Sequence, residues 1–207
     1  MSRKKLAVAA VFFDLDGVLI DSMHLWFRLV NATAKAFDHP PVEWPAFEST
    51  WGQGVAADIQ VFFQGNSVDE IESYYAAHFL DFIDHLKVDR DAEVVMSRLV
   101  DHGFHTAVIT NTPAVLATMI VQHSGLSPEL VVGATEVIAA KPAPDMILLA
   151  CAWFELAPSD SVLLGDSRFD EEAAAQAGAN HIGYRYPAQR RIDTLVELFD
   201  QLELHEP

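Results

Sequence analysis

Cysteine is nearly absent from the sequence, which has only Cys151 among 207 residues. A single cysteine cannot form an internal disulfide, and Cys151 lies in an apolar helical pattern where a small buried thiol is expected. This usage fits a reducing compartment, so we expect the protein to be cytoplasmic. The sequence also lacks a run of roughly 20 apolar residues, the length that a membrane-spanning helix needs. We therefore expect no membrane partner.

Positive charge is scarce as well. The chain has 13 Lys and Arg residues against 30 Asp and Glu residues, and its formal net charge is -17. Because such a field repels the phosphates of nucleic acids, we expect no nucleic-acid partner. The hydrophobic share of 51% and the charged share of 21% are typical of a globular protein. The length allows one sizeable core with a small inserted domain.

Two carboxylates follow an apolar run near the start of the chain. Residues Leu6 to Phe13 are rich in Val, Phe and Ala and contain no Gly or Pro, which predicts a buried strand. Side chains alternate along a strand, so Asp14 and Asp16 should project to the same side, and Gly17 then allows a sharp turn. Two acids at this place favour a site that holds a divalent cation or moves protons. A plain Asp-Gly turn is the alternative.

Patterns along the rest of the chain divide it into two kinds of structure. A capping-box sequence at Ser67 predicts a helix that continues to Leu86. From Asp91 onward, helices alternate with short apolar strands, which is the pattern of an α/β fold. The last expected strand is residues 181–184, and an apolar pattern over residues 192–199 predicts a closing helix.

We therefore predict an α/β fold with a doubly wound, Rossmann-like parallel sheet and an inserted α-helical cap domain. The catalytic core would comprise residues 1–21 and 90–207, and the cap, all helix and loop, would comprise residues 22–89. In an open sheet of this kind, ligands bind at the carboxyl ends of the strands. The end of the first strand is therefore the place to look for a site.

Three further polar segments fall where strands or turns of the core are expected to end. They are Thr110-Asn111-Thr112, then Lys141 before a Pro-containing turn, then Asp166-Ser167 with Asp170 shortly after. Taken singly, the first and last are explained by helix capping, and Lys141 by an ordinary solvated lysine. Gathered at one edge of a sheet, they would form a single site.

In this order, the segments around Asp14, Thr110, Lys141 and Asp166 resemble the haloacid dehalogenase superfamily. Within it they are similar to the phosphoglycolate phosphatase and β-phosphoglucomutase-like branch, which has a helical cap after the first strand. An acid at Asp16, two positions after the first aspartate, is typical of the members that act on phosphoryl groups. The resemblance covers most of the expected core.

The resemblance implies roles for five core residues. Asp14 would be the nucleophile and Asp16 the general acid and base. Thr110 and Asn111 would bind the phosphoryl group, and Lys141 would neutralise its charge. These roles suit phosphate-ester hydrolysis, because an anionic nucleophile can attack an anionic phosphoryl group only when the charges are shielded.

The resemblance also implies a Mg²⁺ cofactor. Its expected ligands are Asp14, Asp166 and Asp16, the last through its backbone carbonyl. Asp170 and Ser167 would support the site. Mg²⁺ prefers a few carboxylates together with water and phosphate oxygens, which agrees with this set.

The cap holds the candidate residues for substrate recognition. Trp51 and Gln53 lie in a glycine-containing loop and are expected to contact the substrate, with Arg28 as a possible cation. The alternative is structural: Trp51 would pack in the cap, and Arg28 would be solvated. The loop sequence over 52–57 also matches a G-x-G-x-x-A dinucleotide fingerprint, but no strand is expected before it, as that motif requires.

These observations predict a Mg²⁺-dependent phosphatase that hydrolyses a small phosphorylated metabolite, similar to phosphoglycolate or a sugar phosphate, through an aspartyl phosphate. A phosphomutase of the β-phosphoglucomutase type is the main alternative, since the same residues can pass the phosphoryl group to another hydroxyl. A nucleotide-cofactor-binding or non-catalytic protein is a more remote one. We expect a monomer or dimer.

Overall fold

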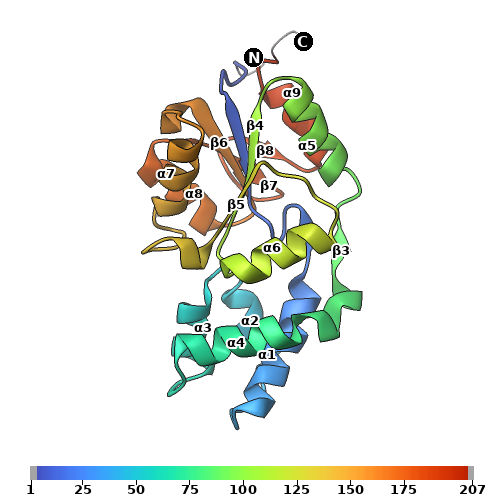
Figure 1. Cartoon of the computed structure of the whole chain (residues 1–207), viewed down its shortest axis with the longest axis vertical. Helices are drawn as coiled ribbons and strands as arrows, with labels where there is room; N and C mark the ends of the chain where they lie inside the picture. Colours follow the sequence, from blue (N-terminus) through green and yellow to red (C-terminus); the bar gives the residue numbers. More distant parts are fainter. Residues whose placement is uncertain (1–3, 205–207) are drawn as a thin grey trace.

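The computed structural model describes residues 4–204 and contains a parallel sheet in the order β5-β4-β1-β6-β7-β8 (Figure 1). The strands are β1 (Ala10–Phe13), β4 (His105–Thr110), β5 (Leu130–Gly133), β6 (Ser161–Gly165), β7 (Asn180–Tyr184) and β8 (Arg191–Ile192). β1 pairs with β4 on one side and with β6 on the other. The first strand is therefore central, and the residues that follow it lie between the ends of its neighbours.

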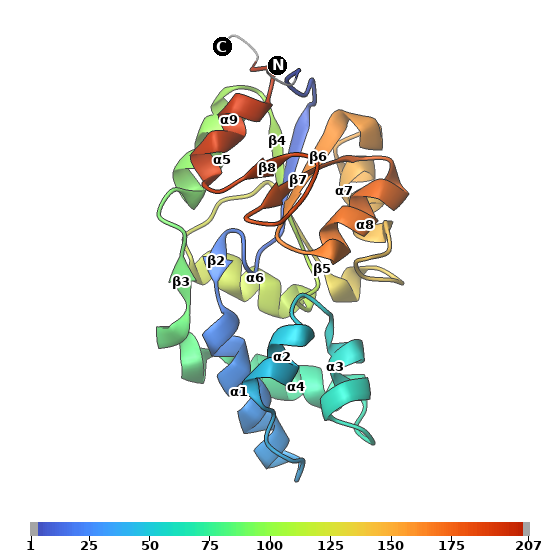
Figure 2. The ribbon, with the colours of Figure 1, turned by 180° about the vertical axis from the view of Figure 1, so that it is seen from behind.

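Helices cover both faces of the sheet, as Figures 1 and 2 show from opposite sides. α5 (Ala92–Asp101), α6 (Ala114–His123) and α9 (Leu198–Gln201) share a buried cluster with Val11 and Phe13 of β1. α7 (Asp145–Trp153) and α8 (Arg168–Ala177) share a second cluster with Ala10 and Phe12. The alternation along β1 thus supplies two cores, one on each face.

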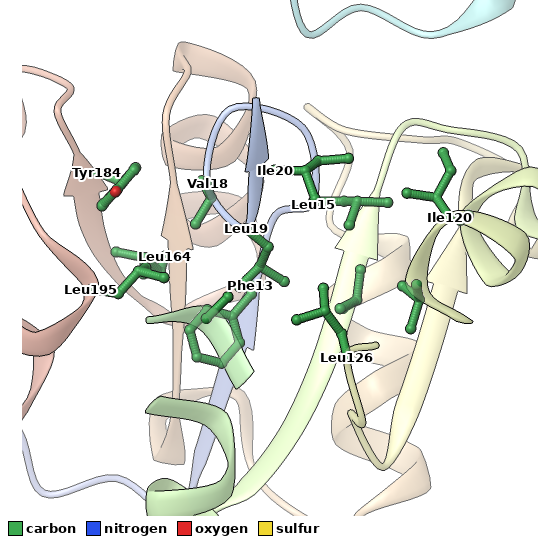
Figure 3. Close-up of a cluster of buried hydrophobic side chains, with 14 of the residues drawn as sticks. Phe13, Leu15, Val18, Leu19, Ile20, Ile120, Leu126, Leu164, Tyr184 and Leu195 are labelled. Atoms are coloured by element: carbon green, nitrogen blue, oxygen red, sulfur yellow. The ribbon is translucent and has the colours of Figure 1, made fainter. Parts of the chain in front are cut away.

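The larger cluster holds the turn after β1 in place. Leu15, Val18 and Leu19 are buried in it beside Phe13 and Leu164 (Figure 3). Phe13 and Leu15 alternate with the acids Asp14 and Asp16, so burial of the apolar residues fixes where the acids lie. Packing of this turn therefore positions the candidate site.

The cap comprises four helices and a 3-10 helix, gathered beyond the carboxyl ends of the strands (Figure 2). They are α1 (Met23–Ala36), α2 (Trp44–Ser49), α3 (Val55–Phe62), α4 (Val68–His78) and η1 (Phe79–His85). The chain enters the cap through β2 (Ile20–Asp21) and leaves it through β3 (Lys87–Val88), and these two short strands pair antiparallel. The predicted α/β fold with an inserted helical region is confirmed, whereas the exact boundaries of the two domains remain a prediction.

Two predicted elements of the core differ in extent from the structure. β1 begins at Ala10 rather than Leu6, because its neighbours begin opposite Ala10, and Leu6 forms only an isolated bridge with Leu202. The closing helix is also shorter than predicted. Ile192 belongs to β8, which the sequence analysis missed, and helical structure resumes with a 3-10 turn at Leu195.

Two predictions for the cap also need correction. The helix from Ser67 ends at His78 and continues as η1, where Phe79 and Phe82, three residues apart, lie on one face and pack against the core. The cap is not only helix and loop, since it ends in β3. That strand forms through a partner far away in the sequence, so no local pattern indicates it.

The ends of the predicted ranges, residues 1–3 and 205–207, lie outside the described residues. Within residues 4–204, no helix is both long enough and apolar enough to cross a membrane. Cys151 is buried on α7, as expected.

Candidate active site

The parallel sheet brings the predicted site residues to one edge. Asp14 directly follows β1, Thr110 ends β4, and Asp166 directly follows β6. Because these three strands are neighbours and run in the same direction, their carboxyl ends meet. Lys141 reaches the same place from the segment before α7.

Lys141 lies at the floor of the site, almost fully buried. Its Nζ is 2.9 Å from Asp14 Oδ1 and 2.7 Å from Asp170 Oδ1, and it donates to the carbonyl of Ile109 at 3.0 Å. Burial lowers the pKa of Lys141, but the two carboxylates outweigh burial and raise it above its ordinary value. The reading of Lys141 as a solvated surface lysine is therefore wrong.

Asp14 presents one free oxygen to the site. Its Oδ1 accepts from the backbone N–H of Leu15 at 2.7 Å and from Lys141, whereas no described residue donates to Oδ2. Burial, together with Asp170 and Asp166, raises the pKa of Asp14 well above its ordinary value, and Lys141 opposes this rise. A carboxylate that is held in place through one oxygen, while its other oxygen accepts no hydrogen bond, can act as a nucleophile.

Three carboxylates form a possible metal site. Oxygens of Asp14, Asp166 and Asp170 lie within 4.8 Å of one another. Asp166 Oδ1 is buried without a hydrogen-bond partner, and burial raises the pKa of Asp166 to about 7. A divalent cation would supply the missing partner, so the residues present fit Mg²⁺.

Within this cluster the three acids are not equivalent. Both oxygens of Asp170 are already engaged, Oδ1 by Lys141 and Oδ2 by the backbone N–H and hydroxyl of Ser167. Asp14 and Asp166 each retain an unpaired oxygen. The geometry therefore favours these two as ligands and leaves Asp170 and Ser167 to orient Lys141.

The turn after β1 approaches Asp166 closely. Gly17 has φ +85°, and a Cβ built at this position would lie 1.9 Å from Asp166 Oδ2. Only glycine satisfies both the backbone conformation and the contact. The sharp turn predicted at Gly17 thus also makes room for the metal-site acid.

Asp16 lines the same pocket as Asp14, but it is not one of the three clustered carboxylates. Oδ1 accepts hydrogen bonds from the Ser22 hydroxyl and from Trp26 Nε1, the latter at 2.8 Å, and Oδ2 accepts from Thr112 Oγ1 at 2.8 Å. Ser22 is the N-cap residue of α1, but its hydroxyl donates to Asp16 and makes no capping hydrogen bond to the helix. The cap and the core therefore orient Asp16 together.

Asn111 joins the core to the cap. Its Nδ2 donates to the carbonyls of Gly52 and Lys141, both at 2.9 Å, and its Oδ1 is buried without a partner. Thr110 is buried beside it, and Thr110 Oγ1 accepts from the backbone N–H of Thr112. The phosphoryl-binding roles predicted for Thr110 and Asn111 stay predictions.

A partly open pocket lies between core and cap over these residues. It is lined by Asp14, Asp16, Trp26, Val30, Phe47, Thr50, Trp51, Gly52, Gln53, Val55, Asp58, Tyr75, Thr110, Asn111, Thr112 and Pro113. Trp51 and Gln53 line it, and Trp51 Nε1 lies 3.3 Å from Asp166 Oδ2, whereas their contact with a substrate stays a prediction. Arg28 is exposed and outside the lining, so it is not the cation of this pocket.

Asp58 and Trp26 are lining residues that the sequence analysis did not single out. Asp58 stands among Val55, Ile59 and Phe62 on the helical face that turns inward. An acid on an otherwise apolar helical face is unusual, and this sequence pattern indicates a candidate functional residue. The glycine loop before it lies between α2 and α3 with no preceding strand, which is incompatible with a dinucleotide fingerprint.

Comparison with known proteins agrees with this geometry. Residues 11–184 match the family model of haloacid dehalogenase-like hydrolases. The chain is 29% identical to the N-acetylmuramic acid 6-phosphate phosphatase of Pseudomonas aeruginosa over 97% of each chain. It is 27% identical to a phosphoglycolate phosphatase of Rhodobacter capsulatus, over 84% of this chain and 83% of that one.

Solved structures share the fold. CbbY from Rhodobacter sphaeroides, determined in complex with phosphate, superposes with a TM-score of 0.79 at 21% identity over 92% of this chain and 96% of that one. A putative haloacid dehalogenase-like hydrolase from Bacteroides fragilis gives a TM-score of 0.77 at 20% identity over 92% and 99%. Because the family model covers most of the sequence, the chain belongs to the haloacid dehalogenase-like hydrolases.

Proposed function

We propose that the protein is a Mg²⁺-dependent phosphatase that hydrolyses a small phosphorylated metabolite through a phosphorylated Asp14. The observation that carries this proposal is the arrangement of Asp14, whose Oδ1 is held by Lys141 and Leu15 while Oδ2 faces a pocket unengaged. Relatives that act on N-acetylmuramic acid 6-phosphate and on phosphoglycolate support the same class of reaction.

The first step is attack by the Asp14 carboxylate on the phosphorus of the substrate. A phosphorus–oxygen bond forms to Asp14 as the bond to the leaving oxygen breaks, which leaves an acyl phosphate on the protein. Lys141, fixed between Asp14 and Asp170, supplies positive charge where the two anions approach. Asp14 and Asp166 would hold Mg²⁺, which would supply further charge neutralisation.

Asp16 completes both halves of the reaction. In protonated form it would give its proton to the leaving oxygen, and as a carboxylate it would then take a proton from the water that attacks the acyl phosphate. Donors from Trp26 and Ser22 of the cap and from Thr112 of the core hold Asp16 in the wall of the pocket.

A panel of phosphorylated metabolites tests the proposal. Release of inorganic phosphate from phosphoglycolate, N-acetylmuramic acid 6-phosphate, hexose and polyol phosphates, and p-nitrophenyl phosphate is measured with Mg²⁺ and with EDTA. We expect Mg²⁺-dependent release from at least one metabolite. Absence of release from every monoester, at saturating Mg²⁺, would refute it. Formation of a phosphate isomer without inorganic phosphate would identify the phosphomutase instead.

A further inference from the structure

A carboxylate without a counter-charge stands in the cap wall of the pocket. Asp58 on α3 lines the pocket, and Gln53 Nε2 donates to its Oδ1 at 2.8 Å. The hydroxyl of Tyr75 donates to Oδ2 over a long 3.4 Å. A carboxylate can accept about four hydrogen bonds, so Asp58 has unused capacity for donors.

The pocket contains nothing positive to pair with Asp58. None of the described residues that line it is Lys, Arg or His. Lys141, the cation of the site, is engaged by Asp14 and Asp170 at the floor. Because an unpaired carboxylate in such a place is costly, its missing partner is expected to come from the ligand.

The apolar and aromatic residues of the pocket indicate the chemistry of the rest of the ligand. Val30, Phe47 and Val55 are apolar, and Trp26 offers an aromatic surface that can pack against carbon–hydrogen faces. The combination of apolar walls with an acceptor suits a carbon chain or ring that carries hydroxyl groups.

We propose that Asp58 determines substrate class by accepting hydrogen bonds from hydroxyl groups on the leaving group, so that sugar or polyol monophosphates are preferred. The inference rests on the proposed phosphatase function and narrows it. A leaving group that turns a carboxylate toward Asp58 meets like-charge repulsion with no cation in the pocket to offset it. Phosphoglycolate, whose leaving group is small and carboxylated, is therefore a poor substrate.

The test uses matched pairs of substrates that differ by one group. Sorbitol 6-phosphate and 6-phosphogluconate carry a hydroxyl or a carboxylate at the end of the same carbon chain, and 2-hydroxyethyl phosphate and phosphoglycolate form a shorter pair. kcat/KM is measured for each at pH 8, where Asp58 is ionised because burial raises its pKa only to about 7. Because both members of a pair are measured with the same preparation, the ratio of their kcat/KM values does not depend on the fraction of active enzyme.

Asp58→Asn is compared with wild type and with Asp84→Asn, which removes the same charge from an exposed position in the cap outside the pocket. We expect the wild type to prefer the hydroxyl member of a pair by roughly tenfold or more. Asp58→Asn should reduce that ratio to below about threefold, and Asp84→Asn should leave it unchanged. If Asp58→Asn does not fold, the ratio of kcat/KM for the hydroxyl and carboxylate members in wild type still tests the predicted preference.

Three results would overturn the inference. They are a wild-type preference for the carboxylate member, the same ratio in Asp58→Asn as in wild type, and turnover of p-nitrophenyl phosphate with none of the hydroxylated members. Lack of turnover of every monoester, p-nitrophenyl phosphate included, would instead refute the phosphatase function itself. The two failures are thus distinguishable.

Discussion

Asp16 accepts hydrogen bonds from three side chains, which separates its role from that of Asp14. Ser22 and Trp26 belong to the entrance and first helix of the cap, and Thr112 belongs to the core. Asp14 is instead tied to Lys141. Two acids only two positions apart in the sequence thus occupy different surroundings, one suited to nucleophilic attack and one to proton transfer.

This difference predicts the behaviour of Asp16→Asn. The amide keeps the shape, and the Thr112 hydroxyl can rotate to accept from it, so the fold and Mg²⁺ binding should persist. Turnover should fall roughly 10²- to 10⁴-fold, the usual contribution of general acid–base catalysis. Aryl phosphates with acidic leaving groups should lose least in the first step. A uniform loss across leaving groups of widely different pKa would contradict the assignment.

The raised pKa of Asp58 predicts that the stability of the protein depends on pH. Burial raises its pKa from 3.8 to about 7, although Gln53 and Tyr75 oppose the rise. Between these values the folded state holds a proton that the unfolded state has released, so the stabilisation present below about pH 4 is lost as pH rises to about 7. The melting temperature of the wild type should therefore fall relative to Asp58→Asn across this window and change little above it.

Thermal denaturation of the two proteins from pH 4 to pH 8 measures the difference. Asp84→Asn is the control, because its acid is exposed. A difference between wild type and Asp58→Asn that is independent of pH would mean that Asp58 does not hold a raised pKa in the folded state.

The role of a single residue could be predicted from the sequence only where a short motif around that residue indicated it. The acids Asp14 and Asp166 followed from short motifs at strand ends, whereas the charge-neutralising role expected of Lys141 came from the family resemblance and its burial was not predicted. Asp58 did not follow from such a motif, because its importance depends on Gln53, Tyr75 and the core facing it across the pocket. Arg28 was considered only for its charge, and the fold turns it to solvent.

At the scale of elements, α4 is a helix whose start is defined by local chemistry. The Ser67 hydroxyl accepts from the backbone N–H of Glu70, and the Glu70 side chain accepts from the backbone N–H of Ser67. Ser67→Ala should lower the free energy of unfolding by about 1 kcal/mol, the usual effect of losing an N-cap. Chemical denaturation measures it.

Ser73→Ala in the same helix is the matched control. Ser73 is exposed within α4, where alanine has the higher helix propensity. It should be neutral or slightly stabilising. Equal effects of the two substitutions would show that the capping box contributes nothing.

Elements defined by local patterns were predicted well, and elements defined by distant partners were not. The helix at Ser67 and the strand before Thr110 follow from capping and apolar runs. β2 and β3 exist only because the two ends of the cap meet, and the ends of β1 are set by where β4 and β6 begin. Pairing across long stretches of sequence is invisible to a local pattern.

At the scale of the whole molecule, the site is built from both parts of the chain. Trp51 of the cap lies 3.3 Å from Asp166 of the core, and Asn111 of the core donates to Gly52 of the cap. The three carboxylates Asp14, Asp166 and Asp170 therefore lie beneath the cap loop. The family, the fold and the enzyme class could be predicted because their residues recur in fixed order, whereas the substrate depends on how the two parts meet.

Metal binding should stabilise the whole chain. Mg²⁺ relieves the repulsion among Asp14, Asp166 and Asp170, and binding to the folded state alone adds about 1.4 kcal/mol at ten times the dissociation constant. The melting temperature should therefore rise by a few degrees with Mg²⁺ in wild type. Asp166→Asn should lose this shift. A shift that persisted unchanged in the variant would place the metal elsewhere.

The central claim, that Asp14 carries the phosphoryl group during turnover, is tested most directly by trapping it. Wild-type protein is mixed with Mg²⁺ and a substrate labelled in its phosphoryl group, quenched with acid within the first turnover, and digested for mass spectrometry. We predict label on the peptide that contains Asp14 in wild type and none in Asp14→Asn, which should also release no phosphate. Label on another residue, or undiminished turnover by Asp14→Asn, would contradict the account.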